Sequence, residues 1–397
     1  MARLALVLGA FVAIGPLTID MYLPALPTIR EELATTSATV QLTLTGTLVG
    51  LALGQLVVGP LSDRLGRRTP LLWGTALHVV ASALVLVAPT IAVLGVLRVL
   101  QGVGCAATGV VAMAMVRDLF AGRAGATMLS RLFLVMGVAP VLAPTIGGEL
   151  LRVTSWRGIF AVLAGYGVVL LAVGYWGVRE TLPPERRRSG GTAGTLATYG
   201  SLLRDRSYVG LVLVAGLSMA ALFTYVSGSS FVFQRQFGLD EQQFGLLFGA
   251  GAVWLIAATQ VNPVLLRRFS PGQVLLAATA AGTAAAAGLV AVALAGAGVA
   301  VVAVALWAVL FTAGLALPNA PALALAQNGD RAGSAAALLG AVQFGVGAVV
   351  SPAVGLLGND AVAMGAVMVV VLVLALAVLV AVVRPWQVLD VEDALPA

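Results

Sequence analysis

The sequence contains little charge: 10% of its 397 residues are Asp, Glu, Lys or Arg, whereas 60% are hydrophobic. Water-soluble domains carry about 25% charged residues, so this chain has too little charge to cover a surface that faces water. Uncharged apolar stretches of about 20 residues, long enough to cross a bilayer, recur along the chain. The composition therefore predicts an all-α polytopic membrane protein without a sizeable domain outside the membrane.

Three chemically useful residue types are absent or nearly absent. No lysine occurs, and all 22 basic residues are arginines, which excludes the phosphate-binding lysine of an ATPase and any Schiff-base lysine. Cys105 and His78 are the only residues of their kinds, so a disulfide framework, a metal cluster and a Cys/His nucleophile are excluded. We expect both side chains to pack in the core, and we expect no metal, no cofactor and no enzymatic activity.

Twelve apolar spans are predicted in two groups of six. The first six cover roughly 4–26, 38–60, 70–88, 91–116, 127–150 and 158–178, and the second six cover roughly 207–230, 243–264, 272–295, 298–325, 334–356 and 361–383. Between them, Leu196, Tyr199, Leu202 and Leu203 have the spacing of a short amphipathic helix on a membrane surface. We predict an N-terminal six-helix bundle over 1–178, a cytoplasmic linker over 179–206, and a C-terminal bundle with a short cytoplasmic tail over 207–397.

The arginines are distributed unevenly between the two sides of the membrane. If the N-terminus is cytoplasmic, seventeen face inward, namely Arg3, Arg64, Arg67, Arg68, Arg117, Arg123, Arg131, Arg179, Arg186, Arg187, Arg188, Arg204, Arg206, Arg267, Arg268, Arg331 and Arg384. Four face outward, namely Arg30, Arg152, Arg157 and Arg235. Cytoplasmic loops are enriched in basic residues, so both termini are predicted to lie in the cytoplasm. The predicted location is the cell membrane, which is the inner membrane in a bacterium with two membranes. The scattered arginines form no aromatic-interleaved basic face, and nucleic acid is not an expected partner.

Two ionisable residues lie deep inside predicted spans, where each costs at least a few kcal/mol and is a functional candidate. Asp20 lies in the first span and Arg98 in the fourth. They are roughly 9 and 12 Å below the outer surface at a rise of 1.5 Å per residue. We predict that they meet beside a central cavity and couple proton movement to substrate movement; a static buried ion pair is the alternative. Thr224, near the equivalent place in span 7, is neutral.

The loop after span 2 contains a dense charged motif. Gly59 is followed by Asp63, Arg64, Gly66, Arg67 and Arg68, in which Gly66 permits a tight turn and the charges can pair or bind anionic headgroups. This spacing resembles the signature of the major facilitator superfamily. The resemblance implies two six-helix bundles around a central cavity and assigns these six residues to a conformational latch on the inner side.

Spans 1, 4 and 5 extend the resemblance. Span 4 has Arg98, Gln101 and Gly102, and span 5 has Pro140, Pro144, Gly147 and Gly148, which is similar to the motif of proton-driven antiporters. The segments Ile19–Pro27, Trp156–Phe160 and Leu317–Leu325 resemble the Bcr/CflA group of twelve-span drug exporters. Such relatives exchange chloramphenicol-type compounds or bicyclomycin for protons. The resemblance implies that Asp20 and Arg98 are coupling residues, that small drugs and protons are the ligands, and that a proton gradient is the energy source.

Seven polar or aromatic side chains in the spans could line the cavity and offer stacking and hydrogen bonds to a partly apolar ligand. They are Tyr22, Gln101, Thr224, Tyr225, Trp254, Asn319 and Gln343. Helix packing or interfacial anchoring explains each of them equally well. Pro318 is expected to kink span 10 beside Asn319.

The predicted function is proton-coupled efflux of small drugs by alternating access, by a monomer embedded in membrane lipid. A facilitator or symporter of the same fold for a small metabolite is the alternative. An intramembrane enzyme would need a catalytic set, and one His, one Cys and one deep Asp do not supply it. A channel would need rings of like side chains, which are not evident, and a receptor or scaffold would need a soluble domain.

Overall fold

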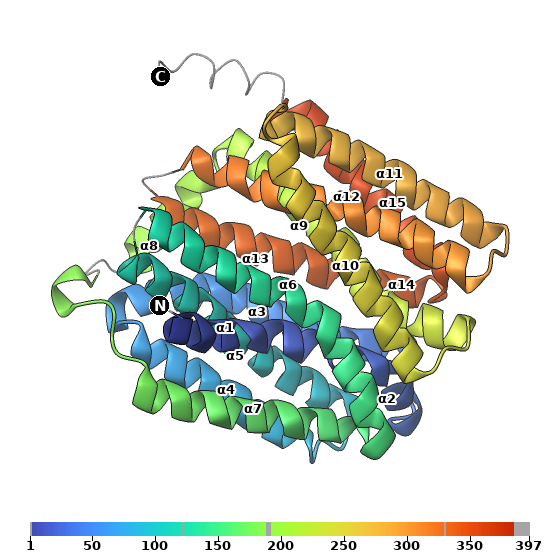
Figure 1. Ribbon diagram of the computed structural model, residues 1–397, viewed down its shortest axis with the longest axis horizontal. Coiled ribbons are helices and arrows are strands. Elements are labelled where there is room, and N and C mark those ends of the chain that lie inside the picture. The colour runs from blue at the N-terminus through green and yellow to red at the C-terminus, as the bar shows by residue number, and fades with distance from the viewer. Residues whose placement is uncertain (1, 121, 188–191, 329–330, 385–397) are drawn as a thin grey trace. The chain divides into compact units, whose positions relative to one another are not determined.

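The computed structural model describes residues 2–120, 122–187, 192–328 and 331–384, which are drawn as ribbons in Figure 1. Most of these residues are helical, and no strand occurs among them. The chain forms two compact units. Unit 1 comprises Met1–Thr192 and Asp240–Gly249, and unit 2 comprises Ala193–Leu239 and Ala250–Ala397.

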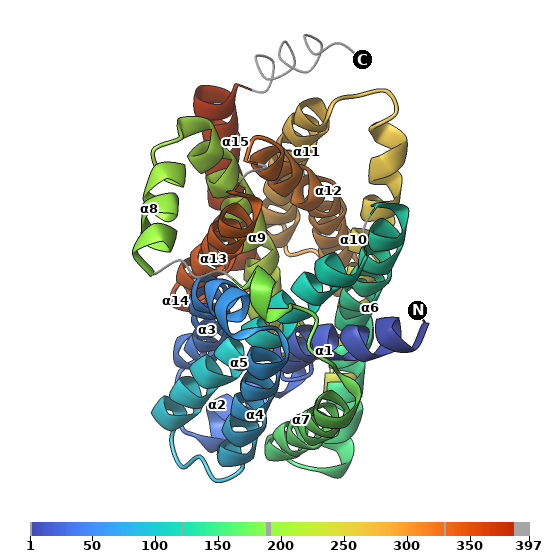
Figure 2. The same cartoon turned by 90° about the vertical axis from the view of Figure 1, so that its left-hand side faces the viewer.

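Unit 1 is a bundle of long helices arranged around α5. Its elements are α1 (Ala2–Asp20), η1 (Leu23–Ala25), α2 (Leu26–Glu32), α3 (Ser37–Leu65), α4 (Arg68–Val85), α5 (Ile91–Leu119), α6 (Gly122–Val153), α7 (Trp156–Gly177) and η2 (Pro184–Arg186). Helix α5 packs against α1, α3, α4 and α6, and α4 packs against α7. Figure 2 shows these helices in a second view, with α3, α4 and α5 as neighbours.

Small residues bring α3 and α5 close together. A Cβ atom added at Gly50 would lie 2.1 Å from the carbonyl oxygen of Val99, and one added at Gly102 would lie 2.1 Å from that of Thr47. Backbones approach this closely only where side chains are absent, which is the usual way that helices associate inside membranes. The contact turns the face of α5 that carries Arg98 and Gln101 into the interior of unit 1.

Unit 2 is built on α9. Its elements are α8 (Thr192–Leu202), α9 (Arg206–Phe231), the π-helical turn η3 (Val232–Gln236), α11 (Pro271–Leu294), α12 (Val299–Ala326), α13 (Ala332–Val350), α14 (Ala353–Leu356), α15 (Ala361–Val378) and η5 (Leu379–Val383). Helix α10 (Glu241–Leu265) is divided, since its residues up to Gly249 belong to unit 1 and those from Ala250 belong to unit 2. Helix α9 packs against α12, α13 and α15. Asp205, Ser270 and Asp360 cap the N-termini of α9, α11 and α15 with side-chain oxygens.

The twelve predicted spans coincide with helices. Among the described residues, eleven helices are long and apolar enough to cross a membrane. Helix α4, at the predicted span 70–88, is not one of the eleven, because Arg68 and His78 lower the hydropathy of its 18 residues. Helix α8 occupies the place of the predicted linker helix. Its position on a membrane surface and the predicted bundle boundaries stay predictions, and Arg188 of the basic run lies outside the described residues.

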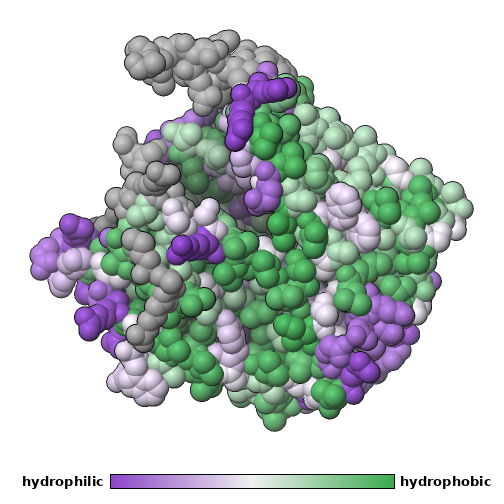
Figure 3. Space-filling view, in the orientation of Figure 1, coloured by the Kyte–Doolittle hydropathy of each residue, from purple (hydrophilic) through white to green (hydrophobic). Residues whose placement is uncertain are grey.

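Large apolar side chains are exposed along the helices, as expected of a protein surrounded by lipid. Trp73 is 76% exposed, Val96 63%, Val304 60% and Val370 58%. Figure 3 shows apolar residues over most of one face, with hydrophilic residues concentrated near its margins. In water such a surface would be an aggregation site, whereas a bilayer covers it.

Candidate functional site

Asp20 lies at a break in the first span. Helix α1 ends at Asp20, and the chain continues through η1 into α2. Pro24 causes the break, because it has no N–H to donate to the carbonyl of the residue four positions earlier. The Asp20 side chain is buried, and among the described residues it takes part in no ion pair. The site therefore holds a buried carboxyl group without a counter-charge.

Arg98 is fully buried in α5 and is only partly satisfied. Its Nη1 donates to the carbonyl oxygen of Thr18 at 2.9 Å and to Oε1 of Gln101 at 3.0 Å. Its guanidinium carbon lies 4.5 Å from the ring centroid of Tyr22 and 5.7 Å from that of Phe160. Nε and Nη2 have no hydrogen-bond acceptor in the described part of the chain. Arg98 thus keeps two buried donors for a further acceptor.

The two predicted coupling residues lie on packed helices but form no ion pair in this structure. Arg98 reaches the backbone of Thr18, two residues before Asp20, instead of the Asp20 carboxyl group. The prediction that Asp20 and Arg98 act together stays a prediction.

Further buried polar groups surround Arg98. The hydroxyl of Tyr22 lies 2.5 Å from that of Thr43, and Oγ1 of Thr18 lies 2.8 Å from Nε2 of His78. Gln101 donates through Nε2 to the hydroxyl of Ser82 at 2.7 Å. Tyr22 and Gln101 are predicted cavity residues, and both belong to this cluster.

Sequence reasoning missed the other members of the cluster. It assigned His78 to packing and did not select Thr18, Thr43, Ser82 or Phe160. His78 and Ser82 are four residues apart on α4, so both lie on one helix face, which is the signal that could have found them. Nothing in the local sequence indicates that this face turns toward Arg98.

The predicted cavity residues of unit 2 contact separate partners. Thr224 donates to the carbonyl of Ala220 in its own helix at 2.8 Å, and Asn319 donates to Oδ1 of Asn262 at 2.8 Å. Trp254 is 47% exposed and packs edge-on against Phe311. Tyr225 is buried beside Gly251, and Gln343 is half-buried.

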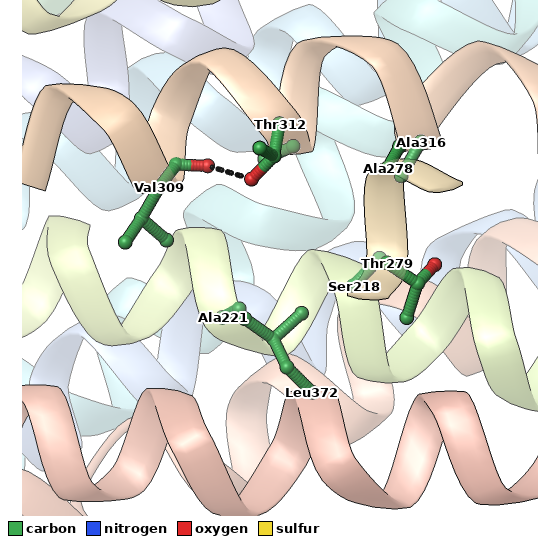
Figure 4. A pocket seen from close by; sticks show the side chains of 9 residues that line it. Ser218, Ala221, Ala278, Thr279, Val309, Thr312, Ala316 and Leu372 are labelled. Carbon is green, nitrogen blue, oxygen red and sulfur yellow. Dashed lines mark hydrogen bonds between the residues drawn. The ribbon is translucent and has the colours of Figure 1, made fainter. Parts of the chain in front are cut away.

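A small cavity lies inside unit 2, between α9, α11, α12 and α15 (Figure 4). Its volume is about 10 Å³, which is room for about one water molecule and too little for a drug. Its lining comprises Ser218, Ala221, Ala278, Thr279, Val309, Thr312, Ala313, Ala316 and Leu372. None of the predicted cavity residues is among them.

The loop between α3 and α4 forms a compact ionic joint around Arg67. Gly66 adopts φ +93°, a left-handed conformation that favours glycine. The turn directs Arg67 onto two carboxylates: its Nη1 lies 2.6 Å from Oδ1 of Asp63, and its Nε lies 2.8 Å from Oδ2 of Asp118. Burial lowers the pKa of Arg67, but its hydrogen bonds to the charged carboxylates of Asp118 and Asp63 outweigh burial and raise the pKa above its ordinary value.

Glu180, after α7, completes this joint through backbone amides. Its carboxylate accepts N–H groups from four residues at 2.7–3.2 Å, namely Arg67, Arg68, Thr181 and Leu182. Burial raises the pKa of Glu180, but these donors lower it further than burial raises it, and the net pKa lies below its ordinary value. The turn at Gly66 therefore holds a bound carboxylate from another part of unit 1.

The remaining latch residues differ in their surroundings. Arg68 donates to the carbonyl of Tyr175 at 2.6 Å, Arg64 is exposed, and a Cβ added at Gly59 would have no atom within 4 Å. The sequence interpretation missed Asp118 and Glu180. Each directly follows an arginine at the end of a span, which is the available signal.

The predicted antiporter-type motif lies within α6, which contains Pro140 and Pro144. A Cβ added at Gly147 would lie 2.1 Å from the carbonyl oxygen of Met21. One added at Gly148 would lie 2.7 Å from that of Glu241. Because these two glycines have no side chain, the backbone of other segments packs directly against α6. At Gly147 the packed residue is Met21, which follows Asp20.

Comparison with known proteins places this arrangement in a family. The model of the Major Facilitator Superfamily matches residues 6–352. The chain belongs to the major facilitator superfamily. It is therefore a transporter rather than an enzyme, and the predicted fold is confirmed.

Several bacterial transporters are similar over most of this chain. The MFS-type transporter YdgK of Bacillus subtilis is 38% identical over 94% of the chain and 93% of its own length. A bicyclomycin resistance protein homolog of Haemophilus influenzae is 30% identical over 89% of both chains. A chloramphenicol resistance protein of Pseudomonas aeruginosa is 34% identical over 69% of this chain and 65% of its own. These relatives confirm the resemblance to the drug-exporter group.

Solved structures of other facilitators share the fold. A bacterial homolog of the human lysosomal transporter Spinster, in an inward-facing and unoccupied conformation, superposes with a TM-score of 0.75 at 15% identity and 97% coverage of both chains. A D-xylose–proton symporter superposes with a TM-score of 0.72 at 15% identity, covering 94% of this chain and 96% of its own. At these identities, the likeness concerns the fold alone.

Proposed function

We propose that this transporter exports small drugs of the chloramphenicol or bicyclomycin type across the inner membrane in exchange for protons. The single observation that carries the proposal is the buried Asp20 carboxyl group, which has no counter-charge among the described residues, two residues after the Thr18 carbonyl that the buried Arg98 binds while two of its nitrogens lack an acceptor. A charged carboxylate in such a place is costly unless it is paired, so the protonated form suits this arrangement. The names of the relatives support drugs as the substrate class.

Proton release would change the balance between these two groups. An ionised Asp20 needs donors, and Nε and Nη2 of Arg98 are two buried donors that lack an acceptor in the described chain. Movement of Asp20 onto Arg98 would then require the break after α1 to shift against α5. In this mechanism, drug and proton occupy the site in turn while the two six-helix bundles rock around it.

The other predicted features fit this scheme. The Arg67 joint would act as the inner-side latch, and the glycines of α6 would let the Asp20 segment approach closely. Both termini are proposed to be cytoplasmic, and a monomer surrounded by lipid suffices as the working unit. A proton gradient supplies the energy, so no cofactor is needed.

The test is chloramphenicol transport by the purified protein in proteoliposomes with an imposed pH gradient. We expect wild-type protein to exchange drug for protons and Asp20→Asn to lose at least about 90% of the gradient-driven rate, because it cannot release a proton. Glu149→Gln, which removes an exposed carboxylate on α6, is the matched control and should retain the rate. Gradient-dependent exchange retained by Asp20→Asn would contradict the role of Asp20.

A facilitator or symporter for a small metabolite is the second candidate, because the same fold serves a D-xylose–proton symporter. Accumulation of a sugar or an organic acid in the same liposomes, with no movement of drug, would favour it. A drug-resistance panel in a host that lacks its own exporters separates the two functions in cells.

A further inference from the structure

A closed ring of buried hydrogen bonds links Arg98 to helix α4. Arg98 binds the carbonyl of Thr18, whose hydroxyl lies 2.8 Å from Nε2 of His78. The carbonyl of His78 accepts from the hydroxyl of Ser82 at 2.7 Å, and that hydroxyl accepts from Gln101. Oε1 of Gln101 accepts from Nη1 of Arg98 at 3.0 Å, which closes the ring. All five side chains are buried, so the ring joins α1, α4 and α5 without access to water.

The surroundings of His78 select one protonation state. Its Nδ1 is buried and has no partner among the described residues. A proton on Nδ1 would be an orphaned buried donor, whereas a proton on Nε2 meets the hydroxyl oxygen of Thr18. A second proton would also place a positive charge close to that of Arg98. The neutral ring with its proton on Nε2, donating to Thr18, is the form that fits.

We propose that His78 is a positioning residue for Arg98. By donating to the Thr18 hydroxyl, the neutral imidazole holds the last turn of α1, and thereby the Thr18 carbonyl that binds Nη1 of Arg98. Ser82 holds the second acceptor, Gln101, from the same face of α4. The ring keeps Nη1 occupied and leaves Nε and Nη2 without an acceptor among the described residues. This inference deepens the proposed function and rests on it, because the group being positioned is the coupling arginine.

Two substitutions of similar volume separate the possible roles of His78. His78→Gln retains a neutral N–H donor, but its amide cannot take up a further proton near neutral pH. His78→Met fills the same space without a strong donor. A positioning role predicts that Gln retains exchange and that Met loses it. Retention by both variants would mean that the ring only fills space, and loss by both would mean that His78 carries protons; either result overturns the proposal.

The transport measurement is the exchange rate of chloramphenicol against protons in proteoliposomes. We expect His78→Met to lower kcat about tenfold and to leave KM within about twofold, because misplacement of Arg98 affects the coupled step more than drug binding. Ser82→Ala should produce a smaller loss of the same kind. Thr75→Val is the matched control, since Thr75 is buried on α4 and donates only to Leu71 of its own helix at 2.7 Å.

The single cysteine provides a readout that does not depend on transport. Cys105 is buried on α5, and its Sγ lies 3.9 Å from the carbonyl oxygen of Ile14 on α1. If the ring ties α1 to α5, its loss should expose this thiol, and we expect alkylation by N-ethylmaleimide to be about fivefold faster in His78→Met. His78→Gln and Thr75→Val should label at the wild-type rate.

The transport assay and the labelling assay test the two hypotheses separately. Wild-type liposomes that do not exchange drug for protons would contradict the proposed function, and the labelling rates would still decide whether His78 holds the α1–α5 contact. Equal labelling of wild type, His78→Gln and His78→Met would overturn the positioning role whatever the transport result.

Discussion

Arg67 binds Asp118 with two nitrogens: Nε lies 2.8 Å from Oδ2, and Nη2 lies 3.3 Å from Oδ1. Asp118 belongs to the end of α5, whereas Arg67 precedes α4. The hydroxyl of Thr181 donates to the same carboxylate at 3.0 Å. The pair therefore joins three segments that are more than 50 residues apart in sequence. Because both partners are largely buried, the bond is screened less than a surface ion pair.

Asp118→Asn tests the contribution of this pair. The amide keeps the shape of the side chain but leaves the charge of Arg67 less compensated, so we expect a loss of about 2 kcal/mol in unfolding free energy. Thermal unfolding in detergent measures it. Glu149→Gln, which breaks the exposed pair with Arg152, is the control and should cost less than about 0.5 kcal/mol. Equal shifts in the two variants would contradict the structural role of Asp118.

Glu180 makes the stability of the joint depend on pH. Burial and four backbone donors together leave the pKa of Glu180 below its ordinary value. A carboxylate with a lower pKa in the folded state stabilises the fold above its unfolded pKa, near 4.3, and this contribution is lost as the pH falls through the folded value. The melting temperature of wild type should therefore exceed that of Glu180→Gln at pH 6–7, and the difference should shrink below about pH 4.

Glu185→Gln serves as the control for this pH series. Glu185 is exposed on η2, and within the described chain it does not accept the amides that Glu180 accepts. Its substitution should leave the melting curve unchanged across the range. A constant difference between wild type and Glu180→Gln from pH 7 to pH 3 would show that the charge of Glu180 contributes nothing.

Gly66→Ala tests the turn itself. The φ of +93° is costly for alanine, and its Cβ would lie 2.4 Å from Oε2 of Glu180. We expect a loss of at least about 1–2 kcal/mol from the backbone conformation, together with displacement of Glu180. The melting temperature in detergent reports the loss, and Gly177→Ala, where an added Cβ meets no atom within 4 Å, should be neutral. An unchanged melting temperature in Gly66→Ala would argue against this turn geometry.

Gly147→Ala tests the approach of α6 to the Asp20 segment. The added Cβ would overlap the carbonyl oxygen of Met21, so α6 and the break after α1 must separate. We expect the yield of folded protein to fall and the remaining protein to lose most of its drug exchange. The control is Gly165→Ala on α7, whose Cβ would lie in open space. Wild-type yield and exchange in Gly147→Ala would show that the close contact is dispensable.

Local sequence was sufficient to predict where the apolar spans lie. Their apolar length fits the bilayer, and the helices of the structure begin and end within a few residues of the predicted limits. Helix α4 shows the limit of that signal. Its His78 and Arg68 reduce its hydropathy, and it is placed as a helix of unit 1 by packing against α5 and α7.

The candidate site was predictable only in part. Asp20 and Arg98 are conspicuous because charge is rare inside spans, and Gly66 because glycine tolerates a left-handed turn. Their partners were predictable only in part: Tyr22 and Gln101, which contact Arg98, stand out in the sequence, whereas Thr18 does not. Asp118 and Glu180 are ordinary acids beside arginines in the sequence, and only the fold brings their carboxylates to Arg67 and its backbone amide.

The sequence by itself determined the class of protein, the positions of its apolar helices and the two deep charged residues, because each follows from the high cost of charge inside a bilayer. Tertiary structure decided what those charges contact. It gave Arg98 the carbonyl of Thr18 instead of the carboxyl group of Asp20, and it closed a ring through His78 that unites three helices. Hydrogen-bond partners depend on which faces of distant helices meet, and that is a property of packing rather than of any local stretch of residues.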